Sequence, residues 1–132
     1  MLIRKILILS LLIYLLSPII VSAEKSSLAG IYSSFRYSDK SGDIVGMEIQ
    51  LIPNPIGYSA IVQASEGAPA FPEAYRIKAS GNTFTLIIPE KSVCGLMPGI
   101  YSGTVTKKAL ILNSPKPLNR KYYLPKGRSF WQ

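Results

Sequence analysis

The stretch IVGMEIQLI, residues 44–52, decides the fold class, because apolar and polar residues alternate along it. The apolar positions of the alternation are Val45, Met47, Ile49 and Leu51. A period of two residues is that of a β-strand with one face on a hydrophobic core and the other on solvent. We therefore expect residues 44–52 to form a half-buried strand.

Similar short apolar and aromatic runs recur along the rest of the chain, separated by Gly, Pro, Asn, Asp and Ser. The runs that we expect to be strands are residues 30–37, 44–52, 57–65, 73–79, 83–88, 99–106, 109–113 and 120–124. Turn residues such as Pro53-Asn54-Pro55 and Ser80-Gly81-Asn82 stand between them. Because no stretch after residue 23 has a helical period, the sequence predicts an all-β domain.

About eight short strands joined mostly by tight turns predict a single small antiparallel meander barrel. Closing the sheet pairs the last strand with the first and removes its unpaired edges. A β-sandwich is the alternative arrangement. If the sheet closes, the end of the chain is fixed, and we expect Phe130 and Trp131 to be structural, capping the barrel or packing near Tyr32.

The first 23 residues read MLIRKILILSLLIYLLSPIIVSA, which has the three parts of a secretory signal peptide. A basic start precedes an apolar run, and small residues precede the expected cleavage site after Ala23. An uncleaved membrane anchor is the alternative, but the apolar run is short and Pro18 interrupts it. The prediction is an exported protein of the bacterial envelope, periplasmic or secreted, whose residues 24–132 form one domain.

Gly30-Ile31-Tyr32 opens the first expected strand, where lipocalins carry Gly-x-Trp. With its expected meander, the chain resembles the calycin group of small barrels, which includes lipocalins and avidins. The resemblance implies a meander barrel, with Gly30 and Tyr32 in structural roles and a lumen for a small ligand. It also implies that a basic residue near the last strand, Arg120 or Arg128, packs over Tyr32. It carries over no binding residue.

A non-catalytic binding protein is the function that the sequence favours, with a small molecule or lipid held at the barrel mouth. The candidate ligand-binding residues are Glu48, Tyr58, Glu66, Phe71 and Tyr75. Tyrosines offer an apolar ring with a polar tip, and a charge inside a strand must face water or a polar lumen. Plain barrel packing and surface charges are the alternative roles for these residues.

A protein-binding role, as an inhibitor, an immunity-type factor or an envelope accessory factor, is the alternative function. Two longer connections, residues 66–72 and 89–98, carry apolar side chains, which mark a contact surface or a plug over the barrel mouth. Residues 91–132 hold eight basic and no acidic residues, which favours an acidic protein or an anionic envelope surface as partner. The candidate residues of this surface are Lys107, Lys108, Arg120, Lys121, Lys126 and Arg128.

Several chemistries are disfavoured by the residue inventory. The chain has no histidine and a single cysteine, Cys94, so we expect neither a zinc or copper site nor an activated nucleophile, and no cofactor is indicated. Paired carboxylates from Glu48, Glu66 and Glu73 are the only enzymatic route, and surface charge is the simpler role for them. A nucleic-acid motif is missing. Short strands, with Arg76 and Lys78 on one face, disfavour a membrane-spanning barrel.

Overall fold

The computed structural model describes residues 27–132, and all of its regular elements are β-strands. They are β1 (Gly30–Ser33), β2 (Arg36–Tyr37), β3 (Ile44–Asn54), β4 (Gly57–Gly67), β5 (Glu73–Ser80), β6 (Thr83–Ile88), β7 (Gly99–Val105), β8 (Ala109–Asn113) and β9 (Lys121–Pro125). No helix in the described part is long and apolar enough to cross a membrane. The expected signal peptide, residues 1–23, and residues 24–26 lie outside the described residues.

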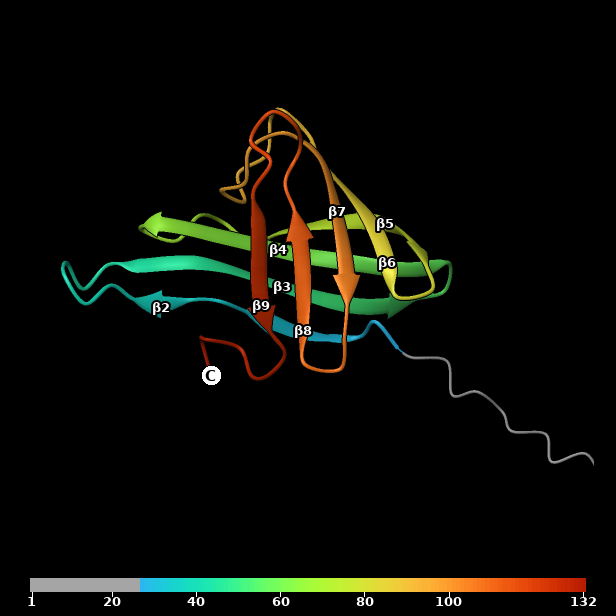
Figure 1. Cartoon of the computed structure of the whole chain (residues 1–132), viewed down its shortest axis with the longest axis horizontal. Helices are drawn as coiled ribbons and strands as arrows, with labels where there is room; N and C mark the ends of the chain where they lie inside the picture. The colour runs from blue at the N-terminus through green and yellow to red at the C-terminus, as the bar shows by residue number, and fades with distance from the viewer. Residues whose placement is uncertain (1–26) are drawn as a thin grey trace, which may run out of the picture.

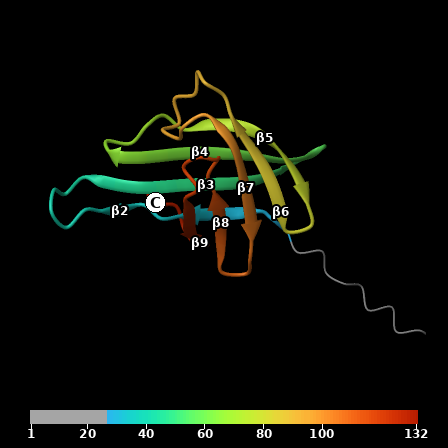
Figure 2. The same cartoon turned by 45° about the horizontal axis from the view of Figure 1, so that its top comes forward.

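The strands form one antiparallel sheet in the order β1-β3-β4-β5-β6-β7-β8-β9, with β2 as a second partner of β3. This order confirms the predicted meander. β3 and β4 run across one side of the molecule, and β7, β8 and β9 cross them on the other side (Figures 1 and 2). The sheet nearly closes, because Tyr32 of β1 bridges Lys126 and the Gly127 amide donates to the Ile31 carbonyl over 3.0 Å.

The interior of the barrel is filled with side chains. The largest fully buried residues are Tyr32, Tyr101, Leu28, Ile49, Leu51, Leu86, Ile88, Leu110, Leu112, Leu124, Val62 and Cys94. The alternation read from residues 44–52 is confirmed, since Met47, Ile49 and Leu51 are buried while Glu48 and Gln50 lie on the outer face. A solid interior of this kind supplies most of the hydrophobic stabilisation of a small barrel.

The first expected strand, residues 30–37, is divided into β1 and β2 at Ser34 and Phe35. Both strands keep the same register on β3, so this is a local interruption rather than a slip. At the interruption the chain comes close to Gly46, and the Ser34 amide donates to the Met47 carbonyl over 2.8 Å. The Phe35 side chain is only 9% exposed, although it is not part of the barrel's core cluster.

Tyr32 is fully buried and donates its hydroxyl to the Leu28 carbonyl over 2.8 Å. The basic residue over its ring is Lys126, whose Nζ lies 6.0 Å from the ring centroid. The sequence had assigned this place to Arg120 or Arg128, which the structure corrects. Lys126 follows β9 directly and pairs with Tyr32, whereas Arg120 precedes β9 at the other end of the barrel and Arg128 lies beyond Gly127.

Gly103 gives a test of the barrel interior. A Cβ at this position would lie 2.2 Å from the ring of Phe84, its partner across β6 and β7. Phe84 is buried, so Gly103→Ala is expected to lower the free energy of unfolding by about 1–3 kcal/mol, the cost of overpacking a core. Denaturant unfolding measures this change in the free energy of unfolding. The double variant Gly103→Ala with Phe84→Leu should lose less stability than the two single variants lose together.

Exposed Ser102 on the same strand is the matched control, and Ser102→Ala is expected to change stability by less than about 0.5 kcal/mol. If the losses of stability in Gly103→Ala and Phe84→Leu add fully in the double variant, the two residues are not in the contact that the structure shows.

Candidate functional site

The barrel has an open cleft of about 510 Å³ at the end where β3, β7 and β9 begin and β4 ends. We call this the mouth cleft. Its lining includes buried Met47, Ala64 and Tyr101, which lie within the strands, and Tyr122 at the start of β9. An apolar and aromatic surface of this kind is typical of sites for small organic ligands.

The sides of the mouth cleft come from connections between strands. Leu96 and Met97 belong to the 89–98 connection, and Leu118 and Arg120 belong to the 114–120 connection. Glu66 lines the cleft from the end of β4. The cleft therefore places one acidic and one basic side chain beside a mainly apolar surface, which suits a ligand with both an apolar body and a polar group.

The 89–98 connection is tied to the barrel and to the 66–72 connection by main-chain hydrogen bonds. The Ala64 amide donates to the Cys94 carbonyl over 2.7 Å, and the Phe71 amide donates to the Val93 carbonyl over 3.1 Å. The Cys94 side chain is fully buried, and Leu96 packs on the core cluster. The connection therefore covers the barrel end with some side chains, as the plug interpretation expected, and leaves Val93 and Met97 exposed; a role as a contact surface stays a prediction.

Tyr75 anchors this connection from β5. Its hydroxyl donates to the Glu73 carboxylate and accepts from Ser92 Oγ over 2.9 Å, and Ser92 Oγ lies 3.1 Å from Cys94 Sγ. Burial, reinforced by the hydrogen bond to Glu73, raises the pKa of Tyr75. The hydrogen bond from Tyr75 lowers the pKa of the Glu73 carboxyl group. Tyr75 is therefore a neutral phenol engaged in the scaffold.

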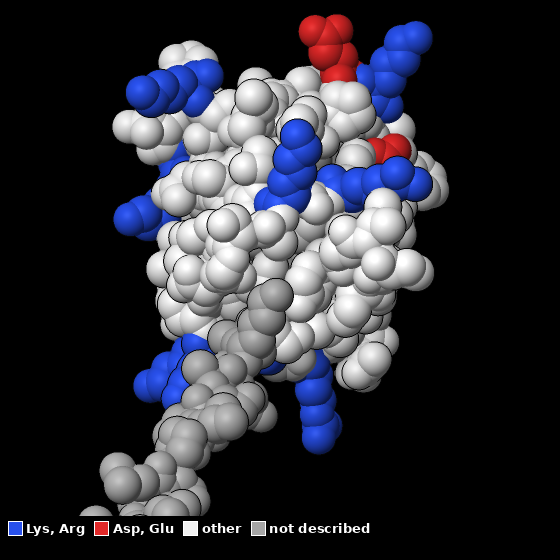
Figure 3. Space-filling view, turned by 90° about the vertical axis from the view of Figure 1, so that its right-hand side faces the viewer, with Lys and Arg blue, Asp and Glu red and all other residues white. Residues whose placement is uncertain are grey.

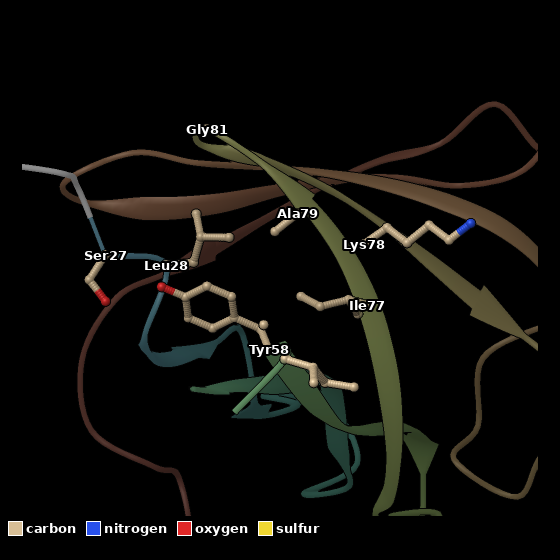
Figure 4. A pocket seen from close by; sticks show the side chains of 9 residues that line it. Ser27, Leu28, Tyr58, Ile77, Lys78, Ala79 and Gly81 are labelled. Atoms are coloured by element: carbon tan, nitrogen blue, oxygen red, sulfur yellow. The ribbon is translucent and has the colours of Figure 1, made fainter. Parts of the chain in front are cut away.

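A second cleft of about 510 Å³ lies at the opposite end of the barrel and is shown in Figure 4. The Tyr58 ring lies beside Leu28 and near Ile77, while the Lys78 side chain extends away from the ring (Figure 4). Ser27, the first described residue, also lines this cleft. Among residues 27–132, the cleft thus offers an aromatic surface, and the one charged side chain of its lining, Lys78, extends away from the ring.

The five predicted ligand-binding residues do not share one site. Glu66 lines the mouth cleft, and Tyr58 lines the cleft at the other end of the same strand, β4. Phe71 is 74% exposed in the 66–72 connection, and Tyr75 is engaged with Glu73 and Ser92. Glu48 lies on the outer face of β3, where Ser129 Oγ donates to it over 2.6 Å and the Phe130 amide over 2.8 Å.

The predicted basic surface is also divided between the two ends of the barrel. Lys107 and Lys108 lie in the β7–β8 turn beside Lys126, whose amide donates to the Lys108 carbonyl over 2.7 Å. Arg120 and Lys121 lie at the opposite end of β9, and Arg128 follows the bend at Gly127. Figure 3 shows Lys and Arg side chains at separate places around one side of the molecule rather than gathered in a patch.

Phe130 and Trp131 lie elsewhere than the sequence placed them. The tail, residues 127–132, packs on the outside of the sheet, and the Phe130 ring centroid is 5.6 Å from that of Phe35 and 5.3 Å from that of Tyr37. Trp131 lies 5.7 Å from Phe35, and its Nε1 donates to Gln63 Oε1 over 2.9 Å. The tail therefore covers Phe35 instead of capping the barrel.

Sequence reasoning missed the contribution of Leu118 and Gln63 to these surfaces. Leu118 lies in the 114–120 connection, which closes on itself through the Ser114 amide and the Arg120 carbonyl at 2.8 Å. Gln63 directly faces Glu48 across β3 and β4, a pairing that becomes visible only once the register of the two strands is known. Within residues 27–132, no three His, Cys, Asp or Glu side chains gather as a metal site would need.

Comparisons of the chain with protein-family models, with curated proteins and with solved structures gave no match.

Proposed function

We propose that this chain is an exported, non-catalytic binding protein that takes a small amphipathic molecule or lipid in the mouth cleft. The observation that carries the proposal is the mouth cleft itself, where buried Tyr101 and Met47 lie beside Leu96 and Met97 with Glu66 and Arg120 at the sides. The signal-like N-terminal sequence supports export to the bacterial envelope or beyond.

The filled interior favours a ligand site at the end of the barrel over one inside it. Small barrels close around side chains and leave little lumen, so a ligand of this protein rests at the end of the barrel. The Tyr101 hydroxyl donates to the Met97 carbonyl over 2.9 Å, which fixes the connection beside the cleft before any ligand arrives. A preformed site loses less conformational entropy on binding than a site that must be ordered by its ligand.

The barrel also supports a relation to the calycin group, which we include in the proposal. Gly30 and Tyr32 resemble the Gly-x-Trp opening of lipocalins, and Lys126 lies over the Tyr32 ring as a basic residue does in that group. Gly30 fits this arrangement, because a Cβ there would lie 2.9 Å from the Lys126 side chain. Members of that group bind ligands at or inside the barrel, in keeping with a ligand in the mouth cleft.

A protein-binding role is the second candidate, favoured by the 66–72 and 89–98 connections. Phe71 and Val93 are exposed and adjacent, joined by the hydrogen bond from the Phe71 amide. Exposed apolar residues on rigidly held loops suit a protein contact. Removal of Phe71 would weaken such a contact and leave the mouth cleft unchanged, so the two candidate functions separate by mutation.

Binding of an amphipathic probe tests the mouth cleft. We expect the purified protein to bind 1-anilinonaphthalene-8-sulfonate saturably, measured by dye fluorescence. Met97→Glu places a second carboxylate in the cleft and should weaken binding of this apolar anion about tenfold or more, on the scale of one misplaced charge. Native mass spectrometry of protein prepared without detergent should also reveal a copurified small molecule.

Ile100→Glu is the matched control, because Ile100 is 63% exposed and Met97 is 58% exposed, while only Met97 lines the cleft. Equal losses in the two variants would mean that the dye binds to exposed apolar surface in general. That result would overturn the mouth cleft as the binding site.

A further inference from the structure

A separate small cleft of about 220 Å³ lies on the outer face of the sheet, between the tail and the 66–72 connection. We call it the tail groove. Its lining includes Glu48, Gln50, Gln63, Pro72, Ser129 and Trp131. Neither end of the barrel shares these residues, so the tail groove is distinct from the mouth cleft.

The floor of the tail groove is set by strand register. Glu48 and Gln50 project outward from β3, and Gln63 and Ile61 face them directly from β4. Outward positions on adjacent strands stand close enough for their side chains to act on one ligand. The floor therefore joins one carboxylate and two amides on a rigid part of the barrel.

Gln63 fixes both walls of the tail groove. Its Oε1 accepts from Trp131 Nε1 over 2.9 Å, and its Nε2 donates to the Ala70 carbonyl over 2.9 Å. One amide thus ties the tail on one side and the 66–72 connection on the other. The width of the groove is set by this single side chain.

Trp131 is held in place without being buried. The Phe130 ring meets it edge-on at 5.1 Å and 89°, and Phe35 contacts it at 5.7 Å, yet half of Trp131 remains exposed. A large aromatic side chain that is fixed but left open to solvent gains little stability from burial. Its arrangement is that of a preorganised platform for a flat apolar surface.

Glu48 still has hydrogen-bonding capacity to offer. An ionised carboxylate has about four acceptor positions, and Ser129 and the Phe130 amide each occupy one. Their contacts orient the carboxylate and leave acceptor positions for a ligand. Gln50 adds a donor and an acceptor beside it, so the groove presents paired polar groups next to an exposed aromatic ring.

We propose that the tail groove binds one sugar ring of a glycan. A sugar ring has an apolar C–H face that stacks on an aromatic side chain and hydroxyl groups that both donate and accept hydrogen bonds. Trp131 supplies the stacking surface, Glu48 accepts from hydroxyl donors, and Gln50 both donates and accepts. The volume lies below that of sites for drug-sized ligands, which fits a single ring.

The chain carries its own reporter for this binding, because Trp131 is the only tryptophan. We expect titration with neutral tetrasaccharides, namely cellotetraose, chitotetraose and maltotetraose, to give a saturable change in tryptophan fluorescence with at least one of them. Gln50→Ala should weaken that binding about tenfold, on the scale of losing hydrogen bonds to a bound ligand. Gln50 is chosen because its removal leaves the contacts of Gln63 and Glu48 with the tail in place.

Thr85→Ala is the control, since Thr85 lies on β6 away from the tail groove. Isothermal titration calorimetry of Trp131→Ala should show no sugar binding, while circular dichroism establishes that this variant remains folded. Binding of sugar by Met97→Glu at unchanged affinity would separate this site from the mouth cleft. The proposal is overturned if no tetrasaccharide gives a saturable signal or if Gln50→Ala and Thr85→Ala behave alike. A saturable response to the quaternary cation tetramethylammonium, with none to any of the three tetrasaccharides, would also overturn the proposal. It would identify the groove as a cation site instead.

Discussion

Deletion of residues 128–132 is expected to lower the free energy of unfolding by about 2–4 kcal/mol. The loss has two sources. Phe35, 9% exposed in the intact protein, loses the contacts of Phe130 and Trp131 and becomes an apolar side chain on open surface. Glu48 and Gln63 lose their hydrogen bonds to the tail. Denaturant unfolding followed by circular dichroism measures the change.

Removal of Gln132 alone is the matched control for the tail deletion. Gln132 is exposed, and its hydrogen bond is a long main-chain contact of 3.4 Å to Ser129. We expect this shorter deletion to change stability by less than about 0.5 kcal/mol. If the longer deletion is equally mild, the outer aromatic cluster of Phe35, Tyr37, Phe130 and Trp131 contributes nothing to the fold.

Replacement of Gly46 by alanine is the second change with a large expected effect. Gly46 has a φ of +112°, and a Cβ there would lie 2.4 Å from the Ser34 carbonyl oxygen. The obstacle is backbone, which cannot rotate away, so β2 and β3 would have to separate. We expect Gly46→Ala to cost about 3 kcal/mol or more, from backbone strain and overpacking together. Thermal and denaturant unfolding provide the measurement.

Gly42→Ala separates the two sources of that cost. Gly42 also has a positive φ, +74°, but a Cβ there has no atom within 4 Å. Backbone strain alone should therefore destabilise this variant, and the free energy of unfolding should fall by about 1 kcal/mol. Similar losses in both variants would mean that the close approach of Ser34 does not govern the Gly46 position.

The strands could be predicted from the sequence because the barrel has an apolar inside and a polar outside. The alternation of residues 44–52 is reproduced in the burial of Met47, Ile49 and Leu51. Turn residues such as Ser80-Gly81-Asn82 place the ends of strands to within a residue or two. Local patterns suffice here, since β1 and β2 both pair with β3 and every later strand pairs with the next one along the chain, apart from the closure of the barrel.

The grouping of candidate site residues could not be predicted with the same success. Tyr58 and Glu66 stand near the two ends of β4, and the length of that strand separates them. The sequence placed Tyr58 and Glu66 together at the barrel mouth. Separating them required knowledge of which strand ends lie at the same end of the barrel. The register also brings Glu48 opposite Gln63, a pairing fixed only when β3 and β4 are aligned.

The packing of the tail could be predicted even less well from the sequence. Phe35 belonged to an expected strand with no sign that it faced outward, and its burial depends on Phe130 and Trp131. Contacts between distant segments leave no periodic pattern along the chain. The prediction that residues 128–132 are fixed rather than free agrees with these contacts, although they pack on the outside of the barrel.

The contact between Glu48 and Ser129 joins residues 81 positions apart and bears on when this protein acquires its structure. The bridge between Tyr32 and Lys126 joins residues that are still farther apart along the chain. A chain that emerges gradually from a ribosome cannot form either contact until Lys126 and Ser129 have emerged. The barrel therefore cannot close until nearly all of residues 27–132 are available to fold, which makes its closure a late, long-range step of folding.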